Sequence, residues 1–193
     1  MNIGIYIYDQ AEVLDFSGPF EVFCTASRLC TNDVPFTTFL VSQTGEIVTA
    51  RGGYQVVPSY GFKTHPVIDV AIIVGGVHTA EMLKPEVVDW IAQQSKTAKL
   101  MASVCTGAFL LAAAQVITTE SVTTHWEDIA DLRQQYPDLN VQENIRWVDA
   151  GNVVTSGGIS AGIDMSLYLV SKLHSLALAQ KTAKQMEFDW TTP

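Results

Sequence analysis

The chain has 193 residues, of which 48% are hydrophobic and 16% are charged, and its formal net charge is −9. This length suits one well-buried domain, so we expect residues 1–193 to form a single domain. No apolar run reaches the roughly 18 residues that a membrane-spanning helix needs, and no cluster of Lys and Arg provides a phosphate-binding surface. We therefore expect neither a membrane nor a nucleic acid as a partner.

The N-terminal half alternates strand-like with helix-like segments. Its first segment has no basic region before it and no cleavage site after it, which is typical of a strand and not of a signal peptide. In chain order, we predict a strand at 3–8, a helix at 18–29 with Pro19 in its first turn, a strand at 36–42, a hairpin at 47–57 around Gly52 and Gly53, a strand at 70–74 and a helix at 85–96.

The C-terminal half continues the same alternation. We predict a strand at 100–104, a helix at 107–114, a short strand at 121–124, a helix at 126–136 ended by Pro137, a second hairpin at 145–155 around Ala150 and Gly151, and one long helix at 160–181. Alternation of this kind predicts an α/β fold in which helices cover both faces of a mainly parallel sheet.

Cys105 stands between an apolar strand and a helix of small and bulky apolar residues. A side chain at this turn points out from the C-terminal edge of the sheet, next to a helix N-terminus. There, unpaired amides and the helix dipole favour the thiolate. This placement indicates a reactive sulfur. The alternative is that Cys105 is a small buried hydrophobe, as many free cysteines are.

The other two cysteines, Cys24 and Cys30, lie six residues apart on one predicted helix and are interpreted as packing residues. An odd number of cysteines favours free thiols in a reducing compartment, so we expect a cytoplasmic protein. The four histidines are scattered and no metal-ligand spacing occurs, so we expect no metal.

Five further residues follow predicted strands, at the sheet edge where α/β proteins bind ligands. Asp15 either caps the first helix or, desolvated by apolar neighbours, shares a proton with the sulfur. Gly75 and Gly76 form either a tight turn or a close backbone approach to a ligand, in which the amides of Gly76 and Thr106 would stabilise negative charge. Thr106 would also place a hydroxyl beside the thiol. His125 is either a structural group or a base, depending on its hydrogen-bond partner.

Five segments together resemble the ThiJ/PfpI superfamily of the class I glutamine amidotransferase-like fold: LDFSGPFEVF, VGG, SVCTGAFLLA, TTHW and TSGGISAGID. The resemblance implies a flavodoxin-like three-layer sandwich, a nucleophile elbow at Cys105 and a homodimer. The pattern is most similar to the isocyanide hydratase-like branch, whose aspartate, cysteine and threonine match Asp15, Cys105 and Thr106. The sensor domains of AraC-type regulators share SVCTGAFLLA and TTHW, but they add a C-terminal DNA-binding region that is not present before Pro193.

Two other branches match less well. The protease-like branch has a histidine directly after the cysteine, where this chain has Thr106. The glyoxalase and deglycase branch has a glutamate at the position of Asp15, together with a histidine equivalent to His125.

The resemblance implies a lyase that adds water to an isocyanide through a cysteine nucleophile and forms an N-substituted formamide. The partner would be a small-molecule substrate, and no cofactor is expected. Two alternatives remain open, namely a non-enzymatic redox or stress sensor with an oxidisable cysteine, and hydration of glyoxals.

Overall fold

A seven-stranded sheet forms the centre of the computed structural model, which describes residues 1–30 and 34–191. The strand order is β10-β11-β7-β6-β1-β2-β5, and all neighbours are parallel except β10, which runs antiparallel to β11. In chain order these strands are β1 (Asn2–Tyr6), β2 (Thr37–Ser42), β5 (Tyr60–Gly61), β6 (Val70–Ile73), β7 (Leu100–Val104), β10 (Trp147–Asp149) and β11 (Val153–Ser156).

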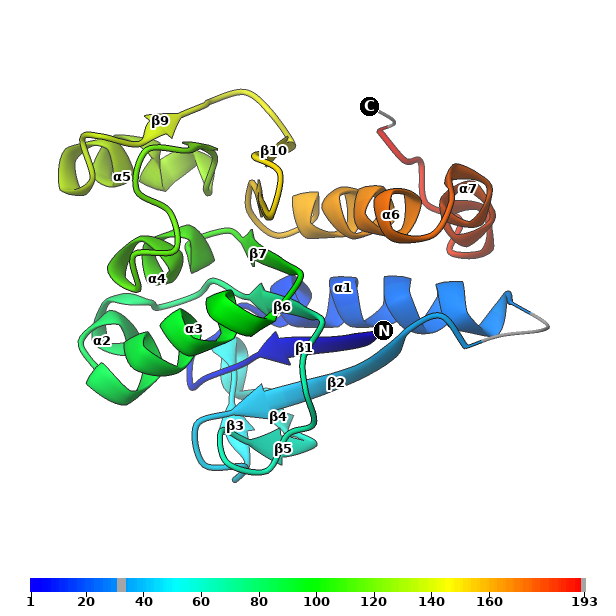
Figure 1. The fold of residues 1–193 in the computed structure, drawn as a ribbon, viewed down its shortest axis with the longest axis horizontal. Helices are drawn as coiled ribbons and strands as arrows, with labels where there is room; N and C mark the ends of the chain where they lie inside the picture. Colours follow the sequence, from blue (N-terminus) through cyan, green and yellow to red (C-terminus); the bar gives the residue numbers. More distant parts are fainter. Residues whose placement is uncertain (31–33, 192–193) are drawn as a thin grey trace.

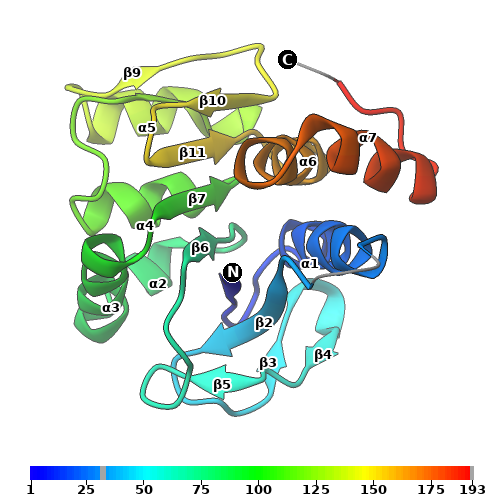
Figure 2. The same cartoon turned by 45° about the vertical axis from the view of Figure 1, so that its right-hand side comes forward.

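Helices cover both faces of this sheet, as Figures 1 and 2 show. On one face, α1 (Val13–Arg28) packs against α6 (Ala161–Leu173) and α7 (Leu176–Gln185). On the other face lie α2 (Thr79–Met82), α3 (Pro85–Thr97) and α4 (Gly107–Ala113). The arrangement is a flavodoxin-like three-layer sandwich, which confirms the predicted fold class.

The central strands consist of buried apolar residues because helices cover them on both sides. Every residue of β6 and of β7 is buried, and β1 is buried from Ile3 to Tyr6. In register, Ile3 of β1 lies beside Val70 of β6, which in turn lies beside Leu100 of β7. The three strands therefore end close together, and the segments that follow them meet at one edge of the sheet.

The first helix begins earlier than predicted, at Val13 and not at residue 18. Asp15 therefore lies in its first turn, and Pro19 lies inside the helix. The prediction placed the start at residue 18, with Pro19 in the first turn, because a proline there loses no hydrogen bond. In the structure, Pro19 lies inside the helix, where its missing N–H cannot form a helical hydrogen bond. Because the helix begins at Val13, Asp15 is a helical residue and is buried.

The predicted long helix at 160–181 is wrong, because it is broken into α6 and α7. His174 leaves the helical region with φ −133° and ψ −77°, and the extended Ser175 begins the next helix. The Ser175 hydroxyl accepts a hydrogen bond from the Leu178 amide at 3.2 Å, so it caps α7.

Both predicted hairpins are confirmed. In the first, β3 (Val48–Thr49) pairs antiparallel with β4 (Gln55–Val56) around the short 3-10 helix η1 (Arg51–Gly53), and in the second, β10 pairs with β11. The predicted strand at 121–124 is the shorter β8 (Ser121–Val122), which pairs with the unpredicted β9 (Asn140–Val141) outside the main sheet. The predicted helix at 126–136 divides into the 3-10 helix η2 (Trp126–Asp128) and α5 (Ile129–Gln135). Across the part of the chain that the structure describes, no helix is long and apolar enough to span a membrane.

Candidate active site

Cys105 occupies a sharp turn between β7 and α4, as expected of a nucleophile elbow. Its φ is +56°, a left-handed conformation that non-glycine residues rarely adopt. Its amide donates to the carbonyls of Ser156 and Gly157, at 3.3 and 3.2 Å, which attaches the turn to the end of β11. Gly107 completes the turn, because a Cβ there would come within 2.1 Å of the Ile73 carbonyl oxygen. The local sequence thus holds the sulfur at the sheet edge in a strained conformation.

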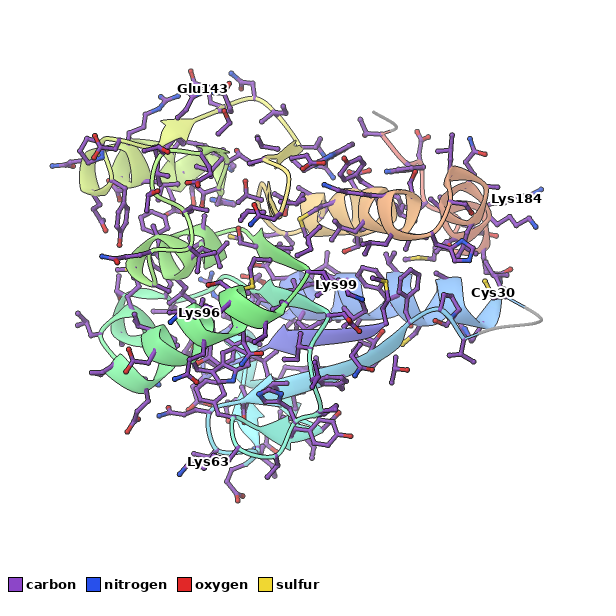
Figure 3. The ribbon with its side chains drawn as sticks, in the orientation of Figure 1. Cys30, Lys63, Lys96, Lys99, Glu143 and Lys184 are labelled. Carbon is purple, nitrogen blue, oxygen red and sulfur yellow. The ribbon has the colours of Figure 1, made fainter. Side chains whose placement is uncertain are left out.

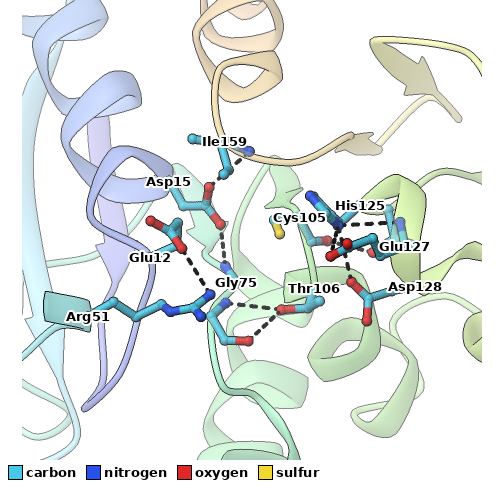
Figure 4. Close-up of polar contacts among 12 residues, drawn as sticks. Glu12, Asp15, Arg51, Gly75, Cys105, Thr106, His125, Glu127, Asp128 and Ile159 are labelled. Atoms are coloured by element: carbon cyan, nitrogen blue, oxygen red, sulfur yellow. Dashed lines mark hydrogen bonds and ion pairs between the residues drawn. The ribbon is translucent and has the colours of Figure 1, made fainter.

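The Asp15 carboxyl is completely buried beside this turn (Figure 4). One oxygen accepts the Gly75 amide at 3.1 Å, the other accepts the Ile159 amide at 3.2 Å, and the Cys105 thiol lies beside the same carboxyl. Burial raises the pKa of Asp15 from 3.8 to about 7, although the bonds from Gly75 and Ile159 act in the opposite direction. A carboxyl with this pKa exchanges a proton readily near neutral pH.

The predicted preference for the thiolate at Cys105 is wrong in this structure. Burial is the largest cause that raises the pKa of the thiol well above its ordinary value, and the negative charge of Asp15 raises it further. A hydrogen bond from the Thr106 amide lowers this pKa but does not outweigh the other causes. The resting pair is therefore a thiol next to a carboxyl group, with the proton on the sulfur whenever Asp15 is ionised.

Gly75 and Gly76 form a tight turn packed against Thr106, which is the first of the two roles that the sequence left open. Gly76 has φ +138°, a turn conformation that favours glycine, and a Cβ on Gly75 would lie 2.6 Å from the Thr106 nitrogen. The Gly75 amide donates to Asp15, and the Gly76 amide donates to the Thr106 hydroxyl at 3.0 Å. Neither glycine amide is therefore unpaired in the way that the predicted cradle for negative charge requires.

Thr106 contributes to the site through its backbone. Its hydroxyl both accepts from the Gly76 amide and donates to the Gly76 carbonyl at 3.1 Å, so it fixes the glycine turn and does not stand free beside the thiol. Its amide, in contrast, is directed at the sulfur. The backbone N–H of Thr106 is the group that can stabilise charge at Cys105.

His125 is hydrogen-bonded mainly within its own segment. Its Nδ1 accepts from the Glu127 amide at 3.4 Å and lies 3.5 Å from the Asp128 carboxylate. Its ring packs on Gly158, where a Cβ would come within 2.0 Å of the ring carbon Cδ2. The structure brings His125 to the wall of the Cys105 cavity, with partners that orient the imidazole.

A cavity of about 300 Å³ opens above Cys105. Its wall also includes Arg51, from the predicted hairpin at 47–57, and three residues that sequence reasoning missed, namely Glu12, His78 and Ile159. Glu12 and Arg51 form an ion pair at 3.1 Å across the cavity rim (Figure 4). Ile159 could have been found from the Gly157-Gly158 turn before it, but Arg51 comes from the inserted hairpin, whose direction the sequence did not indicate. Within residues 1–30 and 34–191, no group of three or more His, Cys, Asp or Glu side chains is arranged to bind a metal.

An α/β sandwich with a cysteine at a strand-to-helix elbow and a buried acid next to it defines a recognisable class of site. The model of the DJ-1/PfpI family matches residues 1–172, and the chain belongs to this family. It is 32% identical to an isonitrile hydratase from Pseudomonas putida over 189 residues, which are 97% of this chain and 78% of that protein.

Other relatives include transcriptional regulators. The HTH-type transcriptional regulator GbdR from Pseudomonas aeruginosa is 24% identical over 97% of this chain, which spans only 51% of that regulator. Among solved structures, a THiJ/PfpI family protein from Pseudomonas syringae superposes with a TM-score of 0.86 at 26% identity, covering 100% of this chain and 76% of the other. Drosophila melanogaster DJ-1beta superposes with a TM-score of 0.82 at 19% identity, with 98% of each chain covered, and shows the fold alone.

Proposed function

We propose that this protein hydrates isonitriles, also called isocyanides, to N-substituted formamides, with Cys105 as the nucleophile and Asp15 as the proton carrier. The observation that carries the proposal is the buried contact between the Asp15 carboxyl and the Cys105 thiol at the elbow. The 32% identity with an isonitrile hydratase over nearly the whole chain supports the same reaction.

The pair suits an electrophile that needs both a nucleophile and a proton. An isonitrile carbon accepts an electron pair from sulfur and then requires a proton on the same carbon. Asp15, with a pKa of about 7, accepts the thiol proton as the Sγ–C bond forms and then delivers this proton to the carbon. The product of this step is a neutral thioimidate on Cys105, and Asp15 is again ionised.

Hydrolysis then releases the product. The Asp15 carboxylate takes a proton from water as the water oxygen adds to the thioimidate carbon. The Thr106 amide then stabilises negative charge on the sulfur when the C–S bond breaks. Asp15 returns its proton to the sulfur, while the nitrogen takes the remaining proton. The net change is isonitrile plus water to N-substituted formamide, and it balances without a cofactor.

The test is formamide production from an isonitrile in water enriched in ¹⁸O, followed by mass spectrometry. We expect one labelled oxygen in the formamide. Cys105→Ala should abolish turnover, and Asp15→Asn should reduce kcat/KM by about 10²- to 10⁴-fold, the range for loss of a general acid-base group. Cys24→Ala is the matched control, since it removes a partly buried thiol in α1, and it should keep wild-type activity. Formamide production that survived in the Cys105→Ala variant would refute the mechanism.

A sensor function is the second candidate, because nearly the whole chain matches about half the length of a transcriptional regulator. A sensor would bind its ligand without turnover, so the same assay separates the two functions. Redox sensing by Cys105 has less support, since the thiol is only 7% exposed and its pKa is raised. Lactate or glycolate release from glyoxals would identify the third alternative.

A further inference from the structure

A second cavity, of about 650 Å³, lies beside the one that contains Cys105. His125 and Ile159 line both cavities, so these two side chains form the boundary between them. We propose that the larger cavity receives the substituent of the isonitrile, and that this substituent is bulky, neutral and largely apolar. The inference rests on the proposed function and names the class of substrate within it.

Three apolar side chains around the larger cavity are exposed to solvent. Trp126 is 76% exposed, Ile145 is 48% exposed and Ile159 is 39% exposed, and they come from three separate segments of the chain. The buried Ile129 and Ala161 add apolar surface to the same cavity. Exposed apolar residues that gather around one hollow indicate a surface that binds something apolar.

The charged groups of this cavity already have partners. Arg146 donates from Nε to the buried Asp164 carboxylate at 2.7 Å, and Glu143, in the segment between β9 and β10 (Figure 3), pairs with Arg133 at 3.4 Å. A charged substituent would compete with these contacts, whereas a neutral substituent would leave both intact.

Charged side chains gather at the rim of the smaller cavity. Its rim includes the Arg51 and Glu12 ion pair together with Glu127 and Asp128, and a large apolar group would take these charges out of water. The reacting isonitrile carbon, in contrast, is only one atom wide. The isonitrile carbon would thus lie in the smaller cavity at Cys105, and the substituent would lie in the larger cavity beyond Ile159.

The boundary between the cavities has a fixed position. The amide of Ile159 donates to Asp15 at 3.2 Å, and the residue has φ +54°, a conformation that a β-branched residue adopts only when its surroundings enforce it. The same residue therefore orients the acid with its backbone and borders the substituent with its side chain.

The test compares methyl isocyanide with benzyl isocyanide on the full-length protein. We expect the wild type to have the higher kcat/KM for the benzyl compound. Trp126→Ala and Ile145→Ala should each lower kcat/KM for benzyl isocyanide about 10-fold, the effect of lost apolar contacts in a pocket, and should change the value for methyl isocyanide less than about 2-fold. Because Trp126 is next to His125, the Ile145 variant, in a different segment, guards against an indirect effect. Leu176→Ala is the matched control, since Leu176 is 50% exposed and begins α7, and it should change neither value.

The outcomes separate this inference from the proposed function. Equal losses for both compounds would overturn the substituent site and leave the hydratase function in place. If the wild type converts neither compound, the hydratase function fails, and the cavity is then tested by calorimetry with N-benzylformamide, whose unchanged affinity in the Trp126→Ala variant would overturn the inference. Conversion of a dimer to a monomer by the Trp126 and Ile145 substitutions would also overturn it, since this face would then bind a second copy of the chain.

Discussion

The acidity of Asp15 depends on neighbours that lie far away in the chain. Leu14 and Phe16 suggest an apolar setting, and the sequence therefore predicted a raised pKa. The sequence could not indicate that the amides of Gly75 and Ile159 would hold the two carboxyl oxygens, because these partners are 60 and 144 residues away. The same limit explains the wrong prediction of a thiolate at Cys105, since local sequence reveals the helix start but not the depth of burial or the charge of Asp15.

The pH profile tests the proton-sharing pair. The sulfur needs an ionised Asp15 to accept its proton, so kcat/KM should rise as the pH increases through about 7, the pKa of Asp15. It should then stay level until well above neutral pH, because the pKa of the thiol is raised. Measurement of isonitrile hydration from pH 5 to 9 checks this. The Asp15→Asn variant should lack the rise near pH 7, and a wild-type rate that fell as the pH increased through 7 would contradict the assignment.

At the level of elements, most strands and the helices α3 and α4 were predictable, whereas the start of α1 and the break between α6 and α7 were not. The strands at 70–74 and 100–104 and both hairpins could be predicted because buried apolar runs and Gly-containing turns are local signals. The start of α1 and the break between α6 and α7 depend on tertiary packing, which can place Pro19 inside a helix and can favour Ser175 as a cap over a continuous helix. The first of these differences matters most for the site, since it moves Asp15 from a cap position to a buried turn.

Gly107 connects the elbow to the neighbouring strand, and its replacement tests how closely the two pack. In Gly107→Ala, the new methyl group would overlap the Ile73 carbonyl, which is backbone and cannot rotate away. We expect a loss of about 1–3 kcal/mol or more in the free energy of unfolding, measured by urea denaturation. Gly157→Ala is the matched control. Its Cβ would lie at an ordinary 3.5 Å from Ala161, so a similar loss there would contradict the explanation.

On the scale of the whole molecule, the buried acid makes folding sensitive to pH. The unfolded chain releases the Asp15 proton near pH 3.8, whereas the folded protein retains it until about pH 7. The folded state therefore binds more protons between these values, and the contribution of Asp15 to stability falls as the pH rises from 4 to 7.

The loss in the free energy of unfolding over this pH range is about 4 kcal/mol, from a shift of about three pKa units at about 1.4 kcal/mol per unit. Urea denaturation of the wild type and of Asp15→Asn, from pH 4 to 8, measures it. We expect the wild type to lose stability relative to the variant as the pH increases. A constant difference between the two proteins over this range would contradict the raised pKa.

The assembly state is a separate prediction at this scale. We expect a homodimer, on the resemblance to the ThiJ/PfpI superfamily, and a mass near twice 21.1 kDa by light scattering after size-exclusion chromatography. A mass of 21.1 kDa at every concentration would show a monomer. Gel-shift measurements with duplex DNA test the expectation of no nucleic acid partner, which the regulators among the relatives leave open.

The two amides that hold Asp15 come from residues 75 and 159, so one of them is synthesised late. While the ribosome has produced only the first 150 residues, the aspartate, the cysteine and the glycine turn already exist, but the second amide does not. During this period the carboxyl lacks half of its backbone anchorage, and the thiol lacks the β11 carbonyls that attach its turn. Nascent chains therefore carry Asp15, Cys105 and the glycine turn before the contacts that arrange them exist, so the proposed hydration would begin only when the last quarter of the chain has folded onto the rest.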